Sequence, residues 1–366
     1  MPETSPPPNP TATAYTVREL HISPNVVLSP MEGVTDLTFR RLIRQIGGVG
    51  LTVTEFVPGG SLAHGDRKVM QTVELDADER PVAIQLFGRD PALLAEGARV
   101  VEGLGANICD INMGCPSKKV CAHSGGSALL QDPALVARIV RAVVGAVSIP
   151  VTVKMRSGFD AAHRNAPEIA AICEAEGASA VAIHWRTRED KYGGERAVDK
   201  IAEAKARLKI PVLGNGDIVD VESALRMFRE TGCDGVLIGR GAVRNPWLLR
   251  QVSDALAGRP ITVVNAAEQR RVMFTYFDDL IRRFNRPAGA IGRMKMFAGY
   301  FSKQLPHGDA LRPRLQRAET VEALYEHALA YFERLDRHEA GDEAAFEAYV
   351  PPERPVRGEI SAEQAV

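Results

Sequence analysis

The sequence predicts an α/β protein, a (β/α)8 TIM barrel followed by a C-terminal helical domain. Short apolar runs rich in Val and Ile recur at intervals of roughly 25–35 residues, and amphipathic helical patterns separate them. Strand patterns end after Trp247, whereas helical patterns continue. Near-continuous apolar strands that alternate with helices are typical of a parallel sheet with helical crossovers. Eight such units in about 230 residues match a closed barrel.

The predicted strands lie at residues 25–30, 51–57, 82–87, 107–112, 151–155, 180–185, 211–216 and 235–240. Two of the intervening helices open on Asp-Pro, at Asp90 and Asp132. Asp is a good N-cap, and Pro suits the first helical position. An open doubly wound sheet is the alternative, but such a sheet normally has a G-x-G-x-x-G turn after its first strand, and no such turn is present there.

Composition and patterning suggest four segments. They are a disordered Pro-rich lead-in (1–20), the barrel (21–250), a helical domain (251–337) with helices at 265–285, 288–305 and 317–335, and an acidic flexible tail (338–366). The lead-in lacks the basic and apolar regions of a signal peptide, and no apolar run approaches the ~20 residues of a membrane span. Five cysteines, an odd number, suit reduced thiols. We therefore expect a cytoplasmic protein without a membrane partner, and a monomer.

Charge is distributed unevenly although the formal net charge is only −1. The stretch Arg270–Arg317 holds 11 Lys and Arg against three Asp and no Glu, whereas Ala318–Val366 holds four Arg against 12 Asp and Glu. Charge alone leaves two interpretations of the basic stretch open, a solvated helix face or a surface that binds nucleic acid.

Polar side chains stand at the predicted C-terminal ends of the strands, which face the active site in this kind of barrel. They are Glu55, Gln85, Asn112, Lys154, His184, Asn215 and Arg240 (beside Gly239), and the first predicted strand ends in Pro30 and Met31. Any one of them alone is more often a loop cap or a solvated group. Together, on different strands at the same level, they predict a binding site.

The chemistry of these groups favours a flavin. The last two strands end in the glycine-rich turns "GNGDI" and "GRGA", and with Arg240 they suit a phosphate. Gln85 suits the pyrimidine edge of a flavin, and Lys154 suits the negative charge that develops at N1–C2=O on reduction. His184 is placed to reach the phosphate or the substrate. FMN is favoured over NAD because no dinucleotide fingerprint is present.

The chain resembles the bacterial tRNA-dihydrouridine synthases. The motifs that carry this resemblance span residues 27–248 in the family's order: "SPMEGVTDLTFR", "VTEFV", "VAIQLFG", "DINMGCPSKKV", "GGSALLQDP", "VTVKMRSG", "AIHWRTR", "GNGDI" and "DGVLIGRGAVRNPWL". The helical segment "RMKMFAGYFSKQLP" resembles the family's tRNA-binding domain more loosely. The resemblance implies an FMN barrel that reduces the C5=C6 bond of specific D-loop uridines in tRNA, with NAD(P)H as reductant.

The resemblance also implies roles for individual residues. Flavin contacts fall on Pro30, Met31, Glu32, Gln85, Lys154, His184, Asn215, Gly216, Asp217, Gly239 and Arg240. The catalytic acid falls on Cys115. Asn112 falls where the family contacts the target base. Beyond the resemblance, we expect the basic residues Lys118, Lys119, Arg186, Arg293 and Lys295 to bind the substrate tRNA.

A protonated thiol suits the acid role, because an ordinary thiol, with a pKa of about 8.5, is mostly protonated near neutral pH. Most free cysteines are inert and buried, and Cys173 and Cys233 are interpreted in that way. Cys109 is expected in the strand core. A metal site from Cys109, Cys115, Cys121 and His123 is disfavoured, because the spacing is C-x5-C-x5-C rather than C-x2-C, so we expect no metal.

Two segments depart from the family pattern. The loop after Cys115 reads "VCAHSGGSALL", with an unusual Cys121 and His123, and Met294-Lys295-Met296 replaces the usual Arg-Lys-His run. The sequence therefore does not select the modified uridine. The alternative function is an FMN-dependent dehydrogenase or reductase of free pyrimidines, which needs no basic helical domain. A non-catalytic RNA-binding protein on a degenerate barrel is the third hypothesis, and the complete set of flavin-type residues argues against it.

Overall fold

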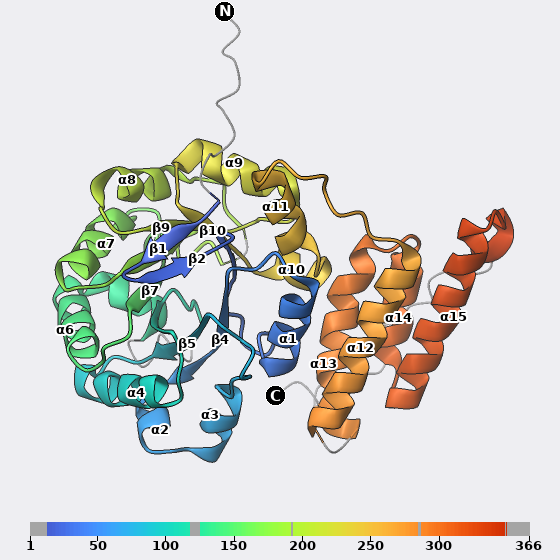
Figure 1. Cartoon of the computed structure of the whole chain (residues 1–366), viewed down its shortest axis with the longest axis horizontal. Coiled ribbons are helices and arrows are strands. Elements are labelled where there is room, and N and C mark those ends of the chain that lie inside the picture. The colour runs from blue at the N-terminus through green and yellow to red at the C-terminus, as the bar shows by residue number, and fades with distance from the viewer. Residues whose placement is uncertain (1–12, 118–124, 192, 285–286, 348, 350–366) are drawn as a thin grey trace, which may run out of the picture. The chain divides into compact units, whose positions relative to one another are not determined.

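The computed structural model describes residues 13–117, 125–191, 193–284, 287–347 and 349. Within these ranges, eight parallel strands close into a barrel in the order β10-β3-β4-β5-β6-β7-β8-β9 (Figure 1). The strands are β3 (Val26–Leu28), β4 (Leu51–Pro58), β5 (Val82–Phe87), β6 (Ile108–Met113), β7 (Val151–Arg156), β8 (Ala180–His184), β9 (Val212–Asn215) and β10 (Gly235–Ile238). The predicted (β/α)8 barrel is confirmed, and each predicted strand segment overlaps one of these strands; β4, β6 and β7 each end one residue later than predicted.

Helices connect successive strands and surround the barrel in Figure 1. They are α1 (Leu37–Ile46), α2 (Gly59–Ala63), α3 (Arg67–Thr72), α4 (Pro91–Gly103), α6 (Pro133–Val144), α7 (Ala166–Ala175), α8 (Asp199–Arg207), α9 (Val221–Thr231), α10 (Arg240–Arg244) and α11 (Leu248–Leu256). Both Asp-Pro helix starts are confirmed. The Asp90 carboxylate accepts hydrogen bonds from the first-turn amides of α4, and Asp132 accepts from Leu135 N in α6.

A short hairpin precedes the barrel, where the sequence predicts a disordered lead-in through residue 20. Strands β1 (Tyr15–Val17) and β2 (Leu20–Ile22) pair antiparallel. The buried side chains of Tyr15, Val17 and Ile22 share one apolar cluster with the first residues of β4, β6 and β8. The hairpin thus covers the N-terminal end of the barrel interior. Its three-residue strands are too short for a sequence period, so only this burial reveals them.

A second unit begins at Val264, so the boundary lies after α11 rather than at residue 250. Its elements are α12 (Ala266–Phe284), α13 (Pro287–Phe301), η2 (Ser302–Gln304), α14 (Gly308–Arg317), α15 (Val321–Glu339) and η3 (Glu343–Phe346). The first part of the predicted flexible tail is folded. Phe346 and Tyr349 are buried, and their rings lie 5.7 and 6.1 Å from the Tyr331 ring. Aromatic burial therefore orders residues that acidic composition had placed in a tail.

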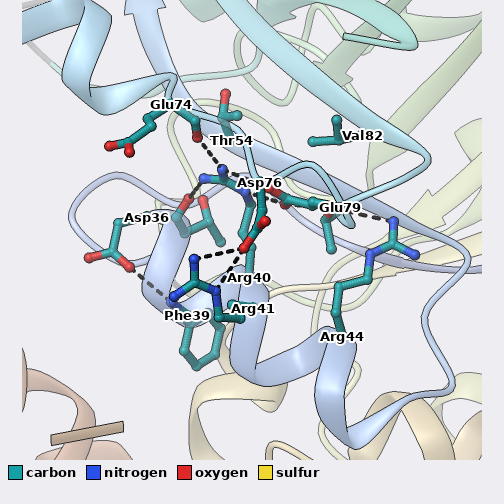
Figure 2. A network of polar contacts seen from close by, with 12 residues as sticks. Asp36, Phe39, Arg40, Arg41, Arg44, Thr54, Glu74, Asp76, Glu79 and Val82 are labelled. Carbon is teal, nitrogen blue, oxygen red and sulfur yellow. Dashed lines mark hydrogen bonds and ion pairs between the residues drawn. The ribbon is translucent and has the colours of Figure 1, made fainter. Parts of the chain in front are cut away.

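A buried ion pair links α1 to the segment before β5 (Figure 2). The Arg40 side chain is fully buried and donates from Nε to Glu79 Oε1 (2.5 Å) and from Nη2 to Glu79 Oε2 (3.1 Å). It also donates to the backbone carbonyls of Thr35 (2.8 Å) and Glu74 (2.7 Å). Thr52 Oγ1 on β4 donates to Glu79 Oε1 (2.9 Å). Both charges are thereby paired and hydrogen-bonded, as buried charges must be.

This ion pair also fixes the loop between β3 and α1. Thr35, whose carbonyl Arg40 binds, accepts a hydrogen bond at Oγ1 from Met31 N (3.0 Å). The loop carries Pro30, Met31 and Glu32, which were predicted to contact the cofactor. Through Thr35, the Arg40–Glu79 pair therefore stabilises the loop after β3 that carries these three residues.

We expect Arg40→Met to lower the free energy of unfolding by about 3–5 kcal/mol, because it leaves the Glu79 carboxylate buried without its cation. Arg41→Met is the matched control on the same helix. Arg41 pairs with Asp76 at 2.7 Å, but its side chain is 43% exposed, so its loss should cost no more than about 1 kcal/mol. Urea unfolding of both variants measures the difference. Equal losses would show that the buried pair is not the stabilising element proposed.

Candidate active site

The barrel register brings the predicted strand-end residues to one level. Asn112 on β6 is the register partner of Lys154 on β7, and His184 on β8 is the partner of Asn215 on β9. Gln85 on β5 is joined to this set by hydrogen bonding. The amides of Gln85, Asn112 and Asn215 are buried, whereas Lys154 and His184 are partly exposed. The five residues therefore form one polar cluster at the C-terminal end of the barrel.

Two of these residues, Gln85 and Asn112, form a continuous hydrogen-bonded chain with Asp110. Thr152 Oγ1 donates to Asp110 Oδ1 (2.6 Å), and Gln85 Nε2 donates to Asp110 Oδ2 (2.5 Å). Asn112 Nδ2 donates in turn to Gln85 Oε1 (2.8 Å). Burial raises the pKa of Asp110 to about 6, against the hydrogen bonds from Thr152 and Gln85 and the charge of Lys154. At pH 7 and above, the carboxylate is therefore mostly ionised.

Cys115 lies in a turn just past β6 that is hydrogen-bonded from three sides. Asn112 Oδ1 accepts from Gly114 N (3.0 Å) and Cys115 N (2.8 Å). Ser127 Oγ donates to the Cys115 carbonyl (2.9 Å), and Arg156 Nε donates to the Gly114 carbonyl (3.0 Å). The thiol residue is 8% exposed. The turn is therefore held in one conformation next to the polar cluster.

Lys154 and His184 sit in an electropositive environment. Burial, and then the neighbouring Arg156, lower the pKa of Lys154 to about 8. Burial and the charges of Lys154, Arg156, Arg186 and Arg240 lower the pKa of His184 well below 6.5. Because Arg186 N donates to His184 Nδ1 (3.1 Å), the neutral imidazole carries its proton on Nε2. Nε2–H is thus a donor that this backbone contact leaves available.

The glycine-rich end of β9 packs closely against β8. Gly216 has φ +115°, and a Cβ there would lie 2.6 Å from the Trp185 ring and 2.9 Å from His184 Cε1. Only glycine fits, because both the backbone conformation and the space exclude a side chain. The Trp185 indole N–H is buried and has no hydrogen-bond partner among the described residues.

Arg186 and Asp217 form a bidentate ion pair next to this turn. Arg186 donates to both Asp217 oxygens, at 2.8 and 2.7 Å, and to the Gly193 carbonyl at 2.6 Å. Arg240 Nη2 lies 3.3 Å from Asp217 Oδ1, and the Arg240 side chain is 47% exposed. The sequence predicts that Asp217 contacts the cofactor and that Arg186 contacts the substrate. In the structure these two side chains bind each other. Asn215 Nδ2 donates a hydrogen bond to the Leu237 carbonyl (2.8 Å).

The loop after β3 borders the cluster near β10. Gly239 lies beside Met31, since a Cβ on Gly239 would be 3.6 Å from Met31 Sδ. Glu55, within β4, accepts a hydrogen bond at Oε2 from Gly33 N (2.6 Å). Pro30 and Met31 are partly buried, whereas Glu32 is exposed.

Four predicted residues are not in the described part of the barrel. Lys118 and Lys119 lie outside the described residues. Arg293 and Lys295 are half-buried on α13 of the second unit. The Arg293 guanidinium is 5.5 Å from the Phe284 ring centroid, which is within cation–π range.

Asp110, Ser127 and Arg156 belong to the site but were absent from the prediction. Asp110 and Asn112 alternate along β6, and Arg156 follows Lys154 by two residues on β7. Residues two apart on a strand share a face, so this spacing could have identified both. Ser127 lies in the 3-10 helix η1 (Gly126–Gln131) and had no local signal. Among the residues that the structure describes, no three His, Cys, Asp or Glu side chains gather to hold a metal. No described helix is both long and apolar enough to span a membrane.

A cysteine turn, a lysine and a histidine that meet at the C-terminal ends of the strands define a (β/α)8-barrel enzyme. Residues 27–335 match the family model described as dihydrouridine synthase. The tRNA-dihydrouridine synthase B of Xanthomonas axonopodis pv. citri is 41% identical over 86% of this chain and 94% of its own. The tRNA-dihydrouridine synthase B of Pseudomonas aeruginosa is 39% identical over 81% of this chain and 90% of its own. A probable tRNA-dihydrouridine synthase of Rhodobacter capsulatus is 44% identical over 66% and 74%. The chain belongs to the dihydrouridine synthase family.

We expect the His184 imidazole to stay neutral as the pH falls through 6.5, because burial and Lys154 disfavour its protonation. The unfolded chain takes up this proton near pH 6.5, so the free energy of unfolding should fall below that pH. NMR titration of the imidazole signal, assigned from its absence in His184→Gln, measures the protonation. A midpoint near 6.5 would contradict the expectation. The His184→Gln variant should also lose less stability between pH 7 and 5 than the wild type.

Proposed function

We propose that this protein is an FMN-dependent tRNA-dihydrouridine synthase that reduces the C5=C6 bond of D-loop uridines in tRNA. NAD(P)H reduces the flavin again after each turnover. The observation that carries the proposal is the position of Cys115. In a chain of this family, Cys115 lies in a hydrogen-bonded turn beside the buried Asn112 amide and near the Lys154 ammonium, at the active-site end of the barrel. That combination suits a proton donor next to a bound planar substrate.

The residues present fit FMN. The close packing of Gly216 against His184 leaves backbone, rather than a side chain, beside the imidazole. His184 Nε2–H, the Gly216 turn and the exposed guanidinium of Arg240 are suited to the phosphate. The Lys154 ammonium and the second N–H of Gln85 are suited to the N1–C2=O edge of the isoalloxazine. Pro30, Met31, Glu32, Asn215, Asp217 and Gly239 complete the proposed flavin site.

Reduced FMN, when bound, supplies hydride to C6 of the uracil. Negative charge then develops at C5 and on the O4 carbonyl, and the Cys115 thiol donates its proton to C5, so that one hydrogen is added to each carbon. Asn112 lies next to this thiol and uses Oδ1 on the turn and one N–H on Gln85. Its second N–H remains to orient a base carbonyl. Lys154 supplies a nearby cation that stabilises the developing negative charge.

A basic stretch within the second unit supports tRNA as the substrate. The stretch Arg270–Arg317 has a net charge of about +8 by sequence and lies in α12 to α14. Clustered Lys and Arg side chains are what a phosphate backbone requires. A free pyrimidine needs no such surface. We propose that Arg293 and Lys295 on α13, Arg186 and the loop residues Lys118 and Lys119 contact the tRNA.

The test is the dihydrouridine content of unmodified tRNA after incubation with the purified protein, FMN and NADPH. Mass spectrometry of nuclease fragments should show a gain of two hydrogen atoms on a D-loop uridine, which also identifies the position. If the protein binds flavin and oxidises NADPH but leaves tRNA unchanged, free uracil and related pyrimidines become the substrates to test. Absence of both flavin binding and NADPH oxidation would overturn the proposal.

Cys115→Ala should lower single-turnover dihydrouridine formation by about 10²–10⁴-fold, the usual contribution of a general acid, and leave flavin and tRNA binding intact. Cys173→Ala is the matched control, because Cys173 is also a buried free thiol but lies on α7. It should react at the wild-type rate. Rapid-quench measurement with prereduced enzyme isolates the chemical step. Wild-type turnover in Cys115→Ala would remove this thiol from the acid role.

Neutralising Arg293 and Lys295 together, as Arg293→Gln/Lys295→Gln, should weaken tRNA binding and reduce its salt dependence, by about 1 in slope for each phosphate that the variant no longer neutralises. Flavin absorbance should not change. Arg141→Gln is the control, because Arg141 is 69% exposed, is paired with Glu176 and lies on α6, outside the basic stretch. Filter binding over a range of salt concentrations measures the slope. The proposed role in tRNA binding would be refuted if the double variant and the control had the same slope and affinity.

A further inference from the structure

The hydrogen-bonded chain under the Cys115 turn has a direction. It begins at the Asp110 carboxylate, passes through the amides of Gln85 and Asn112, and ends at the backbone N–H groups of Gly114 and Cys115. The side chains of Asp110, Gln85 and Asn112 are all at most 6% exposed. Water therefore has little access to replace a missing partner, and each bond in the chain matters.

The two ends of this chain impose the same orientation on both amides. An ionised carboxylate only accepts, so Gln85 must turn its NH2 group toward Asp110 and its carbonyl toward Asn112. Asn112 must then donate to Gln85, which leaves its own carbonyl facing the turn. Backbone N–H groups only donate, so the turn requires that carbonyl as well. Every hydrogen bond of the chain joins a donor to an acceptor in this one arrangement, and reversing either amide would place two donors or two acceptors face to face.

We propose that Asp110 is a positioning residue for the reaction: through Gln85 and Asn112 it holds the Cys115 turn in the conformation from which the thiol acts. Asp110 does not touch the thiol and donates no proton to the substrate. The assignment of the reacting group rests on the proposed function, whereas the hold on the turn does not. Arg156 and Ser127 bind the carbonyl side of the same turn, so Asp110 supplies the support on its N–H side.

Thr152 offers a control that distinguishes a positioning role of Asp110 from a general need to satisfy its buried carboxylate. Its hydroxyl donates to the other carboxylate oxygen and has no link to the turn. A hydroxyl can also accept, so in Asp110→Asn the new amide can donate to Thr152 Oγ1 and still accept from Gln85. Asp110→Asn should therefore preserve the chain, whereas Asp110→Leu, of similar volume, removes its acceptor. Thr152→Val removes one hydrogen bond of the same carboxylate but leaves the chain intact.

The first readout does not depend on catalysis. The rate at which iodoacetamide alkylates Cys115 is followed by peptide mass spectrometry, with the buried Cys173 and Cys233 as internal references. We expect alkylation of Cys115 in Asp110→Leu to be faster by roughly ten-fold or more, because an unsatisfied buried amide loosens the turn. Asp110→Asn and Thr152→Val should match the wild type. Equal rates in all four proteins, or equal acceleration in Asp110→Leu and Thr152→Val, would overturn the proposal.

Single-turnover dihydrouridine formation is the second readout. Asp110→Leu should be slower by roughly ten-fold or more with unchanged tRNA affinity, and Asp110→Asn should restore the wild-type rate to within a few-fold. If the wild type makes no dihydrouridine, the proposed function fails while the alkylation result still decides the role of Asp110. If Asp110→Leu does not fold, Asp110→Asn remains decisive. A large loss of turnover or rapid alkylation in that folded variant would show that the charge, and not the hydrogen-bond direction, is required.

Discussion

The closed register of the parallel barrel is the constraint on which the site depends. Each strand is hydrogen-bonded to both neighbours, so interior side chains at the C-terminal ends are held at a common level. A slip of β6 by one residue would turn Asn112 outward and bring Met113 to the interior. The hairpin of β1 and β2 fills the opposite end with Tyr15 and Val17. The barrel interior is consequently apolar at one end and polar at the other.

Buried polar groups in and around the barrel are tolerated because they satisfy one another. The Asp110 carboxylate accepts from two side chains, and the Arg40 guanidinium meets Glu79 and two backbone carbonyls. Removing a single partner from such a network leaves a buried group with its full desolvation cost. The same hydrogen bonds and ion pairs also make these segments rigid. One network supports the Cys115 turn, and the other supports the loop that carries Met31.

Local signals predicted much of this architecture. The apolar strands and the Asp-Pro helix starts are encoded within a few consecutive residues, so the barrel strands and the caps at Asp90 and Asp132 could be placed in advance. The β1–β2 hairpin, the boundary at Val263 and the folded segment up to Tyr349 could not. Each of these depends on burial against residues distant in the sequence. The hairpin lies in a segment that was predicted to be disordered because it is Pro-rich. The folded segment that includes Phe346 lies in one that was predicted to be flexible because it is acidic.

By itself, the sequence determined the fold class, the strand-end positions of Gln85, Asn112, Lys154 and His184, and the turn that carries Cys115. These follow from periodicity and from motif spacing, which are properties of neighbouring residues. Only the tertiary structure decided how the side chains are paired: Asp110 with Gln85, Arg186 with Asp217, and Arg156 with the Gly114 carbonyl. Hydrogen-bond partners and desolvation are set by the residues that meet across strands, and those meetings exist only once the barrel has closed.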